Sequence, residues 1–141
     1  MILGARSLKR LDGVHPDLVS VVRRAIEITN QDFSVLCGVR TPSEQRDLYA
    51  QGRTKPGVVV TWTLKSNHFV HADGFGHAVD LVPYPVDWKT LSKFDAIADA
   101  MMQAAKELDV TLRWGSDWDM DGLVREAGES DSPHFEIIFR S

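Results

Sequence analysis

Hydrophobic residues recur at helical spacing in three parts of the chain. The first pattern begins at Pro16 and predicts an amphipathic helix over 16–29, with apolar residues at Leu18, Val22, Ala25 and Ile26. Thr41 and Glu44 have the spacing of a capping box, which predicts a short helix over 42–51. The longest pattern predicts a helix over 91–108, with apolar residues at Leu91, Phe94, Ile97, Ala98, Met101, Met102, Ala105 and Leu108.

Five stretches rich in β-branched and aromatic residues predict strands. They are bounded by Gly, Pro or Asp and span 33–39, 58–62, 77–82, 110–114 and 135–139. Because helices and strands do not alternate strictly, the pattern favours an α+β fold with a small, mostly antiparallel sheet packed against helices. The loops at 52–76 and 115–134 are long for a compact domain, and loops of that length commonly carry function.

Length and composition narrow the classes of protein. A chain of 141 residues suits a single domain, residues 1–141. The net charge of -4 and the lack of a basic block argue against nucleic acid as a partner. We expect no membrane insertion and no signal peptide, because no long apolar run occurs. Cys37 is the only cysteine, so it forms no intramolecular disulfide and is expected to be a small buried hydrophobic residue.

Histidines and aspartates concentrate in the middle of the chain, which favours a metal site. His68 and Asp80 lie on two sides of a turn, and His134, the only histidine after residue 77, is the candidate third ligand. Strand alternation points His77 away from Asp80, so these two residues are not expected to share a metal. Two imidazoles and one carboxylate around Zn²⁺ leave a position for water, whose pKa falls to about 7, as hydrolysis requires.

Two further residues are predicted to complete a hydrolytic site. Asp131 precedes His134 by three residues and is placed to move a proton from the attacking water to the leaving amine. Arg40 is placed to stabilise the developing oxyanion, and a surface ion pair with Glu44 is the alternative. Glu136 shares the strand face of His134 and either orients that ligand or is a solvated carboxylate.

Six short motifs occur in one order over residues 38–136. They are Gly38-Val-Arg-Thr-Pro-Ser-Glu-Gln45, Leu48-Tyr-Ala-Gln-Gly-Arg-Thr-Lys-Pro-Gly57, Ser66-Asn-His68, Gly76-His-Ala-Val-Asp-Leu81, Trp114-Gly-Ser-Asp-Trp118 and Asp131-Ser-Pro-His-Phe-Glu136. Through these motifs the sequence resembles the zinc peptidases of the D-alanyl-D-alanine carboxypeptidase and L-alanyl-D-glutamate peptidase family, above all the phage endolysins. The resemblance implies the α+β fold of DD-peptidases and hedgehog-like domains.

The family's functional residues map onto this sequence motif by motif. The resemblance implies Zn²⁺ ligands at His68, Asp80 and His134, a catalytic acid/base at Asp131 and a substrate-polarising arginine at Arg40. Five extra residues between His68 and Gly76 interrupt the usual spacing, and they include His71 and Asp73. His71 is therefore an alternative to His68 as first ligand.

The resemblance also implies a substrate and a setting. It predicts an endolysin that hydrolyses the L-alanyl-D-glutamate bond of peptidoglycan stem peptides and so lyses the host cell. Such an enzyme stays in the host cytoplasm until lysis and then acts on the periplasmic wall, and we expect a monomer. The alternatives are a D-Ala-D-Ala carboxypeptidase or dipeptidase, and a catalytically inactive wall-binding domain on the same fold.

An acidic run in the second long loop resembles the opening of a calcium-binding EF-hand. Its oxygen donors would be Asp117, Asp119 and Asp121. The twelfth position is Gly128 rather than glutamate, although Glu126 or Glu129 could substitute. We therefore hypothesise that Ca²⁺ orders the loop at 115–134, in addition to the Zn²⁺ site. The neighbouring Trp114 and Trp118 are predicted to pack against the fold.

Overall fold

The computed structural model describes residues 1–51, 53–54, 67–117, 120, 124–125 and 131–139. Its helices are α1 (Ala5–Arg10), α2 (Pro16–Ile28), α3 (Pro42–Ala50) and α4 (Leu91–Glu107). Its strands are β1 (Phe33–Cys37), β2 (Ala78–Pro83), β3 (Thr111–Trp114) and β4 (His134–Ile138). The strands form one sheet in the order β1-β2-β4-β3, and each neighbouring pair is antiparallel. The predicted α+β fold with an antiparallel sheet is confirmed.

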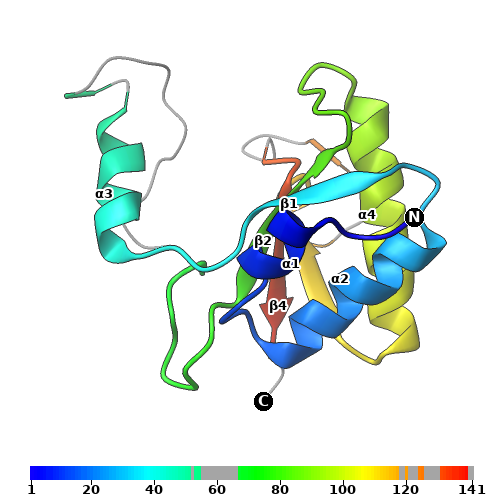
Figure 1. Cartoon of the computed structure of the whole chain (residues 1–141), viewed down its shortest axis with the longest axis horizontal. Helices are drawn as coiled ribbons and strands as arrows, with labels where there is room; N and C mark the ends of the chain where they lie inside the picture. The colour runs from blue at the N-terminus through cyan, green and yellow to red at the C-terminus, as the bar shows by residue number, and fades with distance from the viewer. Residues whose placement is uncertain (52, 55–66, 118–119, 121–123, 126–130, 140–141) are drawn as a thin grey trace.

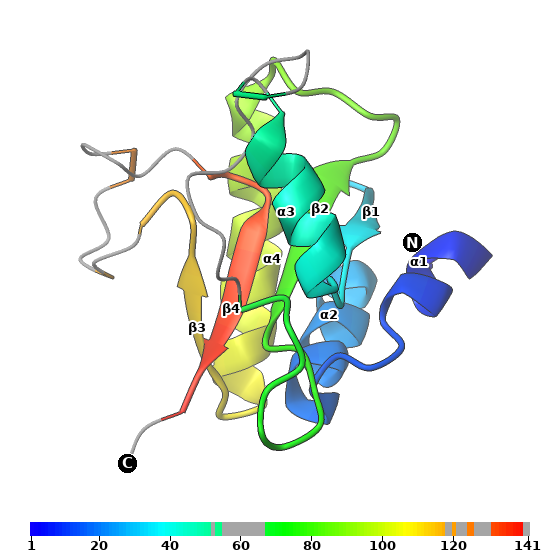
Figure 2. The ribbon, with the colours of Figure 1, turned by 90° about the vertical axis from the view of Figure 1, so that its left-hand side faces the viewer.

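One face of the sheet is covered by helices, and the opposite face carries the predicted metal ligand Asp80. Helices α2 and α4 lie side by side against one face, whereas α3 stands off from the body on the other side (Figures 1 and 2). Strand β2 shows the division, because Val79 and Leu81 belong to the hydrophobic core while Asp80 alternates with them. The face opposite α2 and α4 is therefore free to hold polar side chains.

The three predicted helices, α2, α3 and α4, begin where the sequence predicts. Thr41 Oγ1 accepts from the backbone N–H of Glu44 at 3.1 Å, and the Glu44 carboxylate accepts from Thr41 N–H at 3.2 Å, which completes the predicted capping box. Helix α2 starts at Pro16 after His15, whose ring accepts from Asp17 N–H. The long pattern is confirmed as α4, although Met102 is 41% exposed rather than part of the core.

Three features of the fold differ from the sequence prediction or lie beyond it. Helix α1 was not predicted, because its N-cap Gly4 has no side chain to signal a start. Strand β1 ends at Cys37 instead of residue 39, since the chain turns at Gly38, where a Cβ would lie 1.9 Å from the carbonyl oxygen of Arg10. The predicted strand 58–62 lies outside the described residues. Within the described part of the chain, no helix has the length and apolar character needed to cross a membrane.

Candidate metal centre

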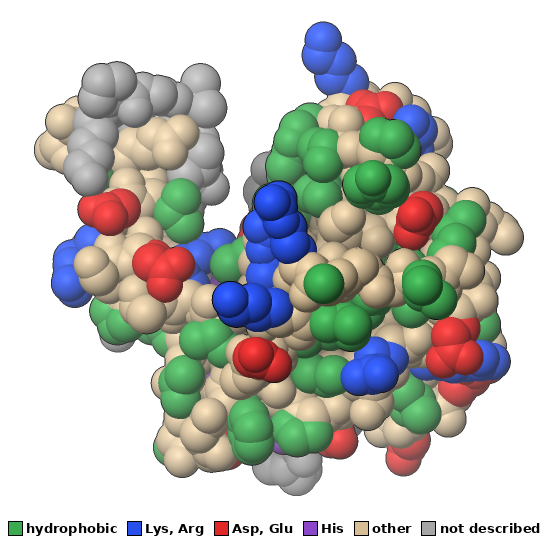
Figure 3. Space-filling view, viewed as in Figure 1, with side chains coloured by type: hydrophobic (Ala, Val, Ile, Leu, Met, Phe, Trp, Pro, Cys, Tyr) green, Lys and Arg blue, Asp and Glu red, His purple; other side chains and the backbone are tan. Residues whose placement is uncertain are grey.

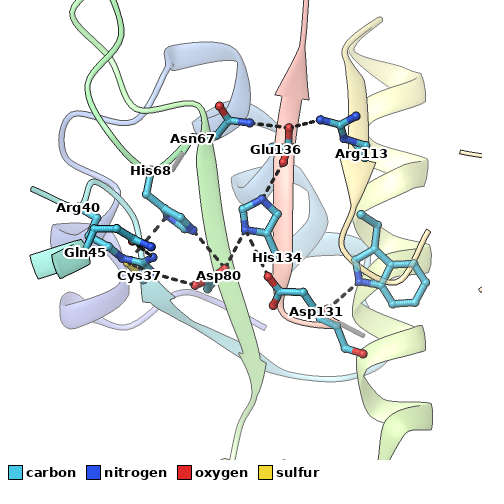
Figure 4. Close-up of polar contacts among 12 residues, drawn as sticks. Cys37, Arg40, Gln45, Asn67, His68, Asp80, Arg113, Asp131, His134 and Glu136 are labelled. Atoms are coloured by element: carbon cyan, nitrogen blue, oxygen red, sulfur yellow. Dashed lines mark hydrogen bonds and ion pairs between the residues drawn. The ribbon is translucent and has the colours of Figure 1, made fainter. Parts of the chain in front are cut away.

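Three neighbouring strands place candidate ligands in one row across the sheet. Asp80 on β2 pairs in register with Cys37 on β1 and with His134 on β4. Residues directly opposite each other on paired strands project from the same face. His68 joins this row from the loop before β2, and its ring meets that of His134 edge-on at 5.1 Å between centroids (Figure 4).

The nitrogen and oxygen atoms at the centre have the spacing of metal ligands. Asp80 Oδ1 lies 3.3 Å from His68 Nε2 and 3.3 Å from His134 Nδ1. Donors bonded to a tetrahedral Zn²⁺ at about 2.0–2.1 Å are themselves about 3.3 Å apart. Asp80 Oδ1 is also buried and makes no hydrogen bond to any described residue. A divalent ion would satisfy this oxygen, so the residues present fit Zn²⁺.

Each candidate histidine ligand has one ring nitrogen that points toward Asp80 and one, the outer nitrogen, that points away from it. The outer nitrogens of His68 and His134 both have partners that orient the rings. His68 Nδ1 lies 2.7 Å from the carbonyl oxygen of Gly38, and His134 Nε2 lies 2.9 Å from Glu136 Oε1. When the outer nitrogen donates its hydrogen, the inner nitrogen keeps a lone pair for a metal. These contacts direct His68 Nε2 and His134 Nδ1 toward Asp80.

Glu136 is the centre of a buried polar network and not a solvated carboxylate. It is 3% exposed, and its Oε2 accepts from Asn67 Nδ2 at 2.7 Å and from Arg113 Nη2 at 2.8 Å. Burial alone raises the pKa of Glu136, but its contacts with His134 and Arg113 outweigh burial and lower it. The ionised carboxylate therefore stabilises the imidazole that it holds.

Arg40 contacts the aspartate of the cluster formed by His68, Asp80 and His134. Its Nη2 is 3.3 Å from Asp80 Oδ2, the carboxylate oxygen that the histidines leave free, and its Nη1 donates to Gln45 Oε1 at 2.6 Å. Gln45 is fully buried, although the other residues of helix α3 are exposed or half-buried. The alternative pairing of Arg40 with Glu44 is not favoured, since the Glu44 carboxylate caps α3.

Cys37 corrects one expectation from the sequence. It is half-buried, and its Sγ lies 3.9 Å from His68 Nδ1 and 3.5 Å from Arg40 Nη2 rather than in an apolar core. The ligand atoms of Cys37, His68 and Asp80 all lie within 4.8 Å of one another, so a second donor set is present. The thiol, however, faces the outer nitrogen of His68, which already contacts the Gly38 carbonyl. The His68, Asp80 and His134 set has the better geometry.

Asp131 lies at the edge of the cluster. Its Oδ2 is 3.9 Å from His134 Nδ1, and half of its side-chain surface is exposed. Desolvation raises the pKa of Asp131, and the negative charge of Asp80 adds to this against the opposing charge of His134. A carboxyl group with a raised pKa beside a metal site is suited to taking up and releasing protons.

Hydrogen bonds from the end of strand β3 hold the turn that contains Asp131. Asp131 N–H donates to the Gly115 carbonyl at 3.1 Å, and the indole N–H of Trp114 donates to the Ser132 carbonyl at 2.6 Å. A Cβ on Gly115 would lie 2.0 Å from Asp131 O, so only glycine permits this approach. Trp114 also stacks on Phe135, which confirms its predicted packing role.

The other histidines lie away from the cluster. His77 Nε2 contacts Asp73 Oδ2 at 2.7 Å, as its opposite orientation on the strand predicts. His71 stacks on His77 with 3.7 Å between ring centroids. The structure therefore brings His68, and not His71, to Asp80.

The charges of the cluster are strongly coupled. Burial lowers the pKa of each imidazole, but contact with the Asp80 carboxylate more than compensates, so the pKa of His68 rises to about 10 and that of His134 to about 9. The pKa of Asp80 is correspondingly well below its usual range, because both imidazoles outweigh the effect of its burial. Protons occupy the imidazoles at neutral pH when no metal does.

The calcium hypothesis is not supported by the described residues. Asp119 and Asp121 lie outside them, as does Trp118. Asp117 is described and closes a turn in which its N–H donates to the Trp114 carbonyl at 2.9 Å. Calcium binding stays a prediction from the sequence.

Two imidazoles and a carboxylate around one point, with a half-exposed acid beside them, are the arrangement typical of mononuclear zinc hydrolases. The family model described as phage L-alanyl-D-glutamate peptidase matches residues 1–138. The chain belongs to this family.

Two relatives match nearly the whole chain. The L-alanyl-D-glutamate peptidase of Escherichia phage T5 is 34% identical in an alignment of 141 positions that covers 96% of each chain. The crystal structure of the Serratia marcescens L-Ala D-Glu endopeptidase ChiX is similar with a TM-score of 0.74 and 35% identity, over 98% of this chain and 91% of that one. Both likenesses agree with the resemblance inferred from the six motifs.

Proposed function

We propose that the protein is a zinc-dependent peptidoglycan endopeptidase that hydrolyses the L-alanyl-D-glutamate bond of the stem peptide. The observation that carries the proposal is the 3.3 Å spacing of His68 Nε2 and His134 Nδ1 from Asp80 Oδ1. Membership of the L-alanyl-D-glutamate peptidase family and the names of both relatives support this bond.

Each residue of the cluster has a defined role. His68, Asp80 and His134 would hold Zn²⁺, which when bound would supply Lewis acidity and lower the pKa of a coordinated water to about 7. Asp131 accepts a proton from the attacking water and delivers it to the nitrogen of the leaving D-glutamate. Arg40 holds Asp80 through Oδ2 and offers its positive charge to the oxyanion that develops on the L-alanine carbonyl.

Mass spectrometry of digested peptidoglycan tests the bond. The proposal predicts peptides with a new amino-terminal D-glutamate and glycan strands that retain L-alanine. Release of terminal D-alanine instead would show the carboxypeptidase or dipeptidase activity, and an unchanged digest with zinc-loaded protein would show an inactive wall-binding domain. Asp131→Ala serves as the control, because it removes the proton carrier and leaves the three ligands.

The proposed setting follows from the substrate. The whole chain, residues 1–141, acts as one catalytic domain and as a monomer with peptidoglycan as its macromolecular partner. It is made in the host cytoplasm and reaches the wall at lysis. Sedimentation of the purified protein tests the proposed monomeric state.

A further inference from the structure

The loop between β2 and α4 holds large apolar side chains in solvent. Tyr84 is 58% exposed, Val86 is 61% exposed and Trp88 is 53% exposed. Figure 1 places this loop at the upper end of the main body. In the same view, Figure 3 shows hydrophobic side chains gathered there, beside the hollow between the body and α3. Grouped exposure of this kind marks binding surfaces in soluble proteins. We refer to residues 84–88 as the aromatic loop.

Hydrogen bonds hold the aromatic loop in place. Asp87 accepts from the backbone N–H groups of Lys89 and Thr90 and from the side chains of Thr90 and Lys93, at distances between 2.8 and 3.1 Å. One side of Trp88 rests on Phe94 of α4, with 5.9 Å between ring centroids. The turn and the Trp88 ring are thus held in place before any ligand arrives, which lowers the entropic cost of binding.

Strand β2 connects the aromatic loop directly to the metal centre. Tyr84 follows Asp80 by four residues, or roughly 13 Å of extended chain. Its N–H donates to the Asp32 carbonyl at 2.9 Å, so the extended pairing with β1 continues past Pro83. Alternate residues of a strand share a face, which places Tyr84 on the side of Asp80.

The chemistry of the substrate requires a sugar close to the metal centre, and this step rests on the proposed function. L-alanine is the stem residue joined to the sugar of the glycan strand, so the bond to D-glutamate lies one residue from the sugar. One extended residue spans at most about 3.6 Å, and a disaccharide extends further from there. The enzyme must therefore accommodate glycan close to the metal centre.

We propose that the aromatic loop binds the glycan strand next to the scissile bond. The rings of Tyr84 and Trp88 offer flat apolar surfaces for the C–H faces of sugar rings, while the sugar hydroxyls stay in water. The loop would thereby select stem peptides that are attached to glycan over free peptides.

Kinetics with two soluble substrates test the proposal. One is the stem peptide attached to its disaccharide, and the other is the same peptide without sugar. We expect wild type to show a higher kcat/KM on the glycan-linked peptide. Trp88→Ala and Tyr84→Ala should each reduce the ratio of the two kcat/KM values about threefold to tenfold, mainly through KM.

Control variants separate the contact from general damage. Met102→Ala removes an exposed apolar side chain eight residues further along α4 than Phe94, or about 12 Å along the helix from the Trp88 contact, and should keep the wild-type ratio. Trp88→Phe and Tyr84→Phe retain a ring and should also keep most of it, so the proposal stays testable if an alanine variant fails to fold. A ratio that the alanine variants leave unchanged, or an equal loss on both substrates, would overturn the glycan contact. Cleavage of neither substrate by wild type would instead count against the proposed function.

Discussion

Glu136→Gln is the substitution that isolates the support of one ligand. The side chain keeps its size, but one carboxylate oxygen becomes an NH₂ group. In the native site one oxygen faces His134 Nε2 and the other accepts from Asn67 and Arg113. An amide cannot accept on both sides, so either His134 or the pair of donors loses its acceptor.

The expected loss can be estimated from that contact. A hydrogen bond to a charged group contributes about 1.5–3 kcal/mol, and loss of a partner behind a metal ligand commonly costs about 10- to 100-fold in affinity or activity. The second range corresponds to about 1.4–2.7 kcal/mol, so the two estimates agree. We expect the zinc affinity of the Glu136→Gln variant to fall by about 10- to 100-fold, with kcat/KM on peptidoglycan peptides falling in parallel.

Competition with a chromophoric chelator measures this zinc affinity. Glu107→Gln is the matched control, because Glu107 pairs with Arg24 on the surface, away from the sheet face of the cluster. Its zinc affinity should equal that of wild type. If Glu136→Gln bound zinc as tightly as wild type, the buried carboxylate would not be orienting His134, and the reasoning would be refuted.

Three further predictions follow from the same geometry. Asp131→Asn should lower kcat by about 10²–10⁴-fold while zinc content stays at the wild-type level, and loss of zinc would show that Asp131 is a ligand instead. Because the pKa values of His68 and His134 are raised to about 10 and about 9, zinc binding at pH 7 must displace about two protons. Apparent zinc affinity should therefore increase with pH up to about 10, the pKa of His68, and titration calorimetry in buffers of different ionisation enthalpy should detect the protons; pH-independent binding would exclude this coupling. Gly115→Ala should displace the Asp131 turn, lowering kcat and costing about 1–3 kcal/mol of stability, which activity assays and thermal unfolding would contradict if both stayed at wild-type values.

The elements that the sequence predicted are those with local signals. The capping box at Thr41 and the apolar period of α4 lie within a few turns of the chain, so neighbouring residues suffice to identify them. Helix α1 has six residues and no side-chain cap, and it depends on packing against β1, which no local pattern records.

The sequence indicated the candidate ligands and offered Glu136 as a residue that orients His134, but it did not indicate the rest of the network behind them. The types and order of His68, Asp80 and His134 indicated a metal, and strand alternation separated His77 from them. Glu136 is two residues from His134, but its own partners are distant in sequence: Asn67 is 69 residues away and Arg113 is 23 residues away, and no spacing rule relates them. The place of Cys37 beside His68 likewise depends on how β1 pairs with β2.

Anomalous X-ray scattering at the zinc edge, from crystals of the zinc-loaded protein, tests the central claim most directly. The account predicts a single strong peak in the cluster, bonded to His68 Nε2, Asp80 Oδ1 and His134 Nδ1. A peak bonded to Cys37 or to His71 in place of one of these residues, or no peak at the cluster, would contradict it.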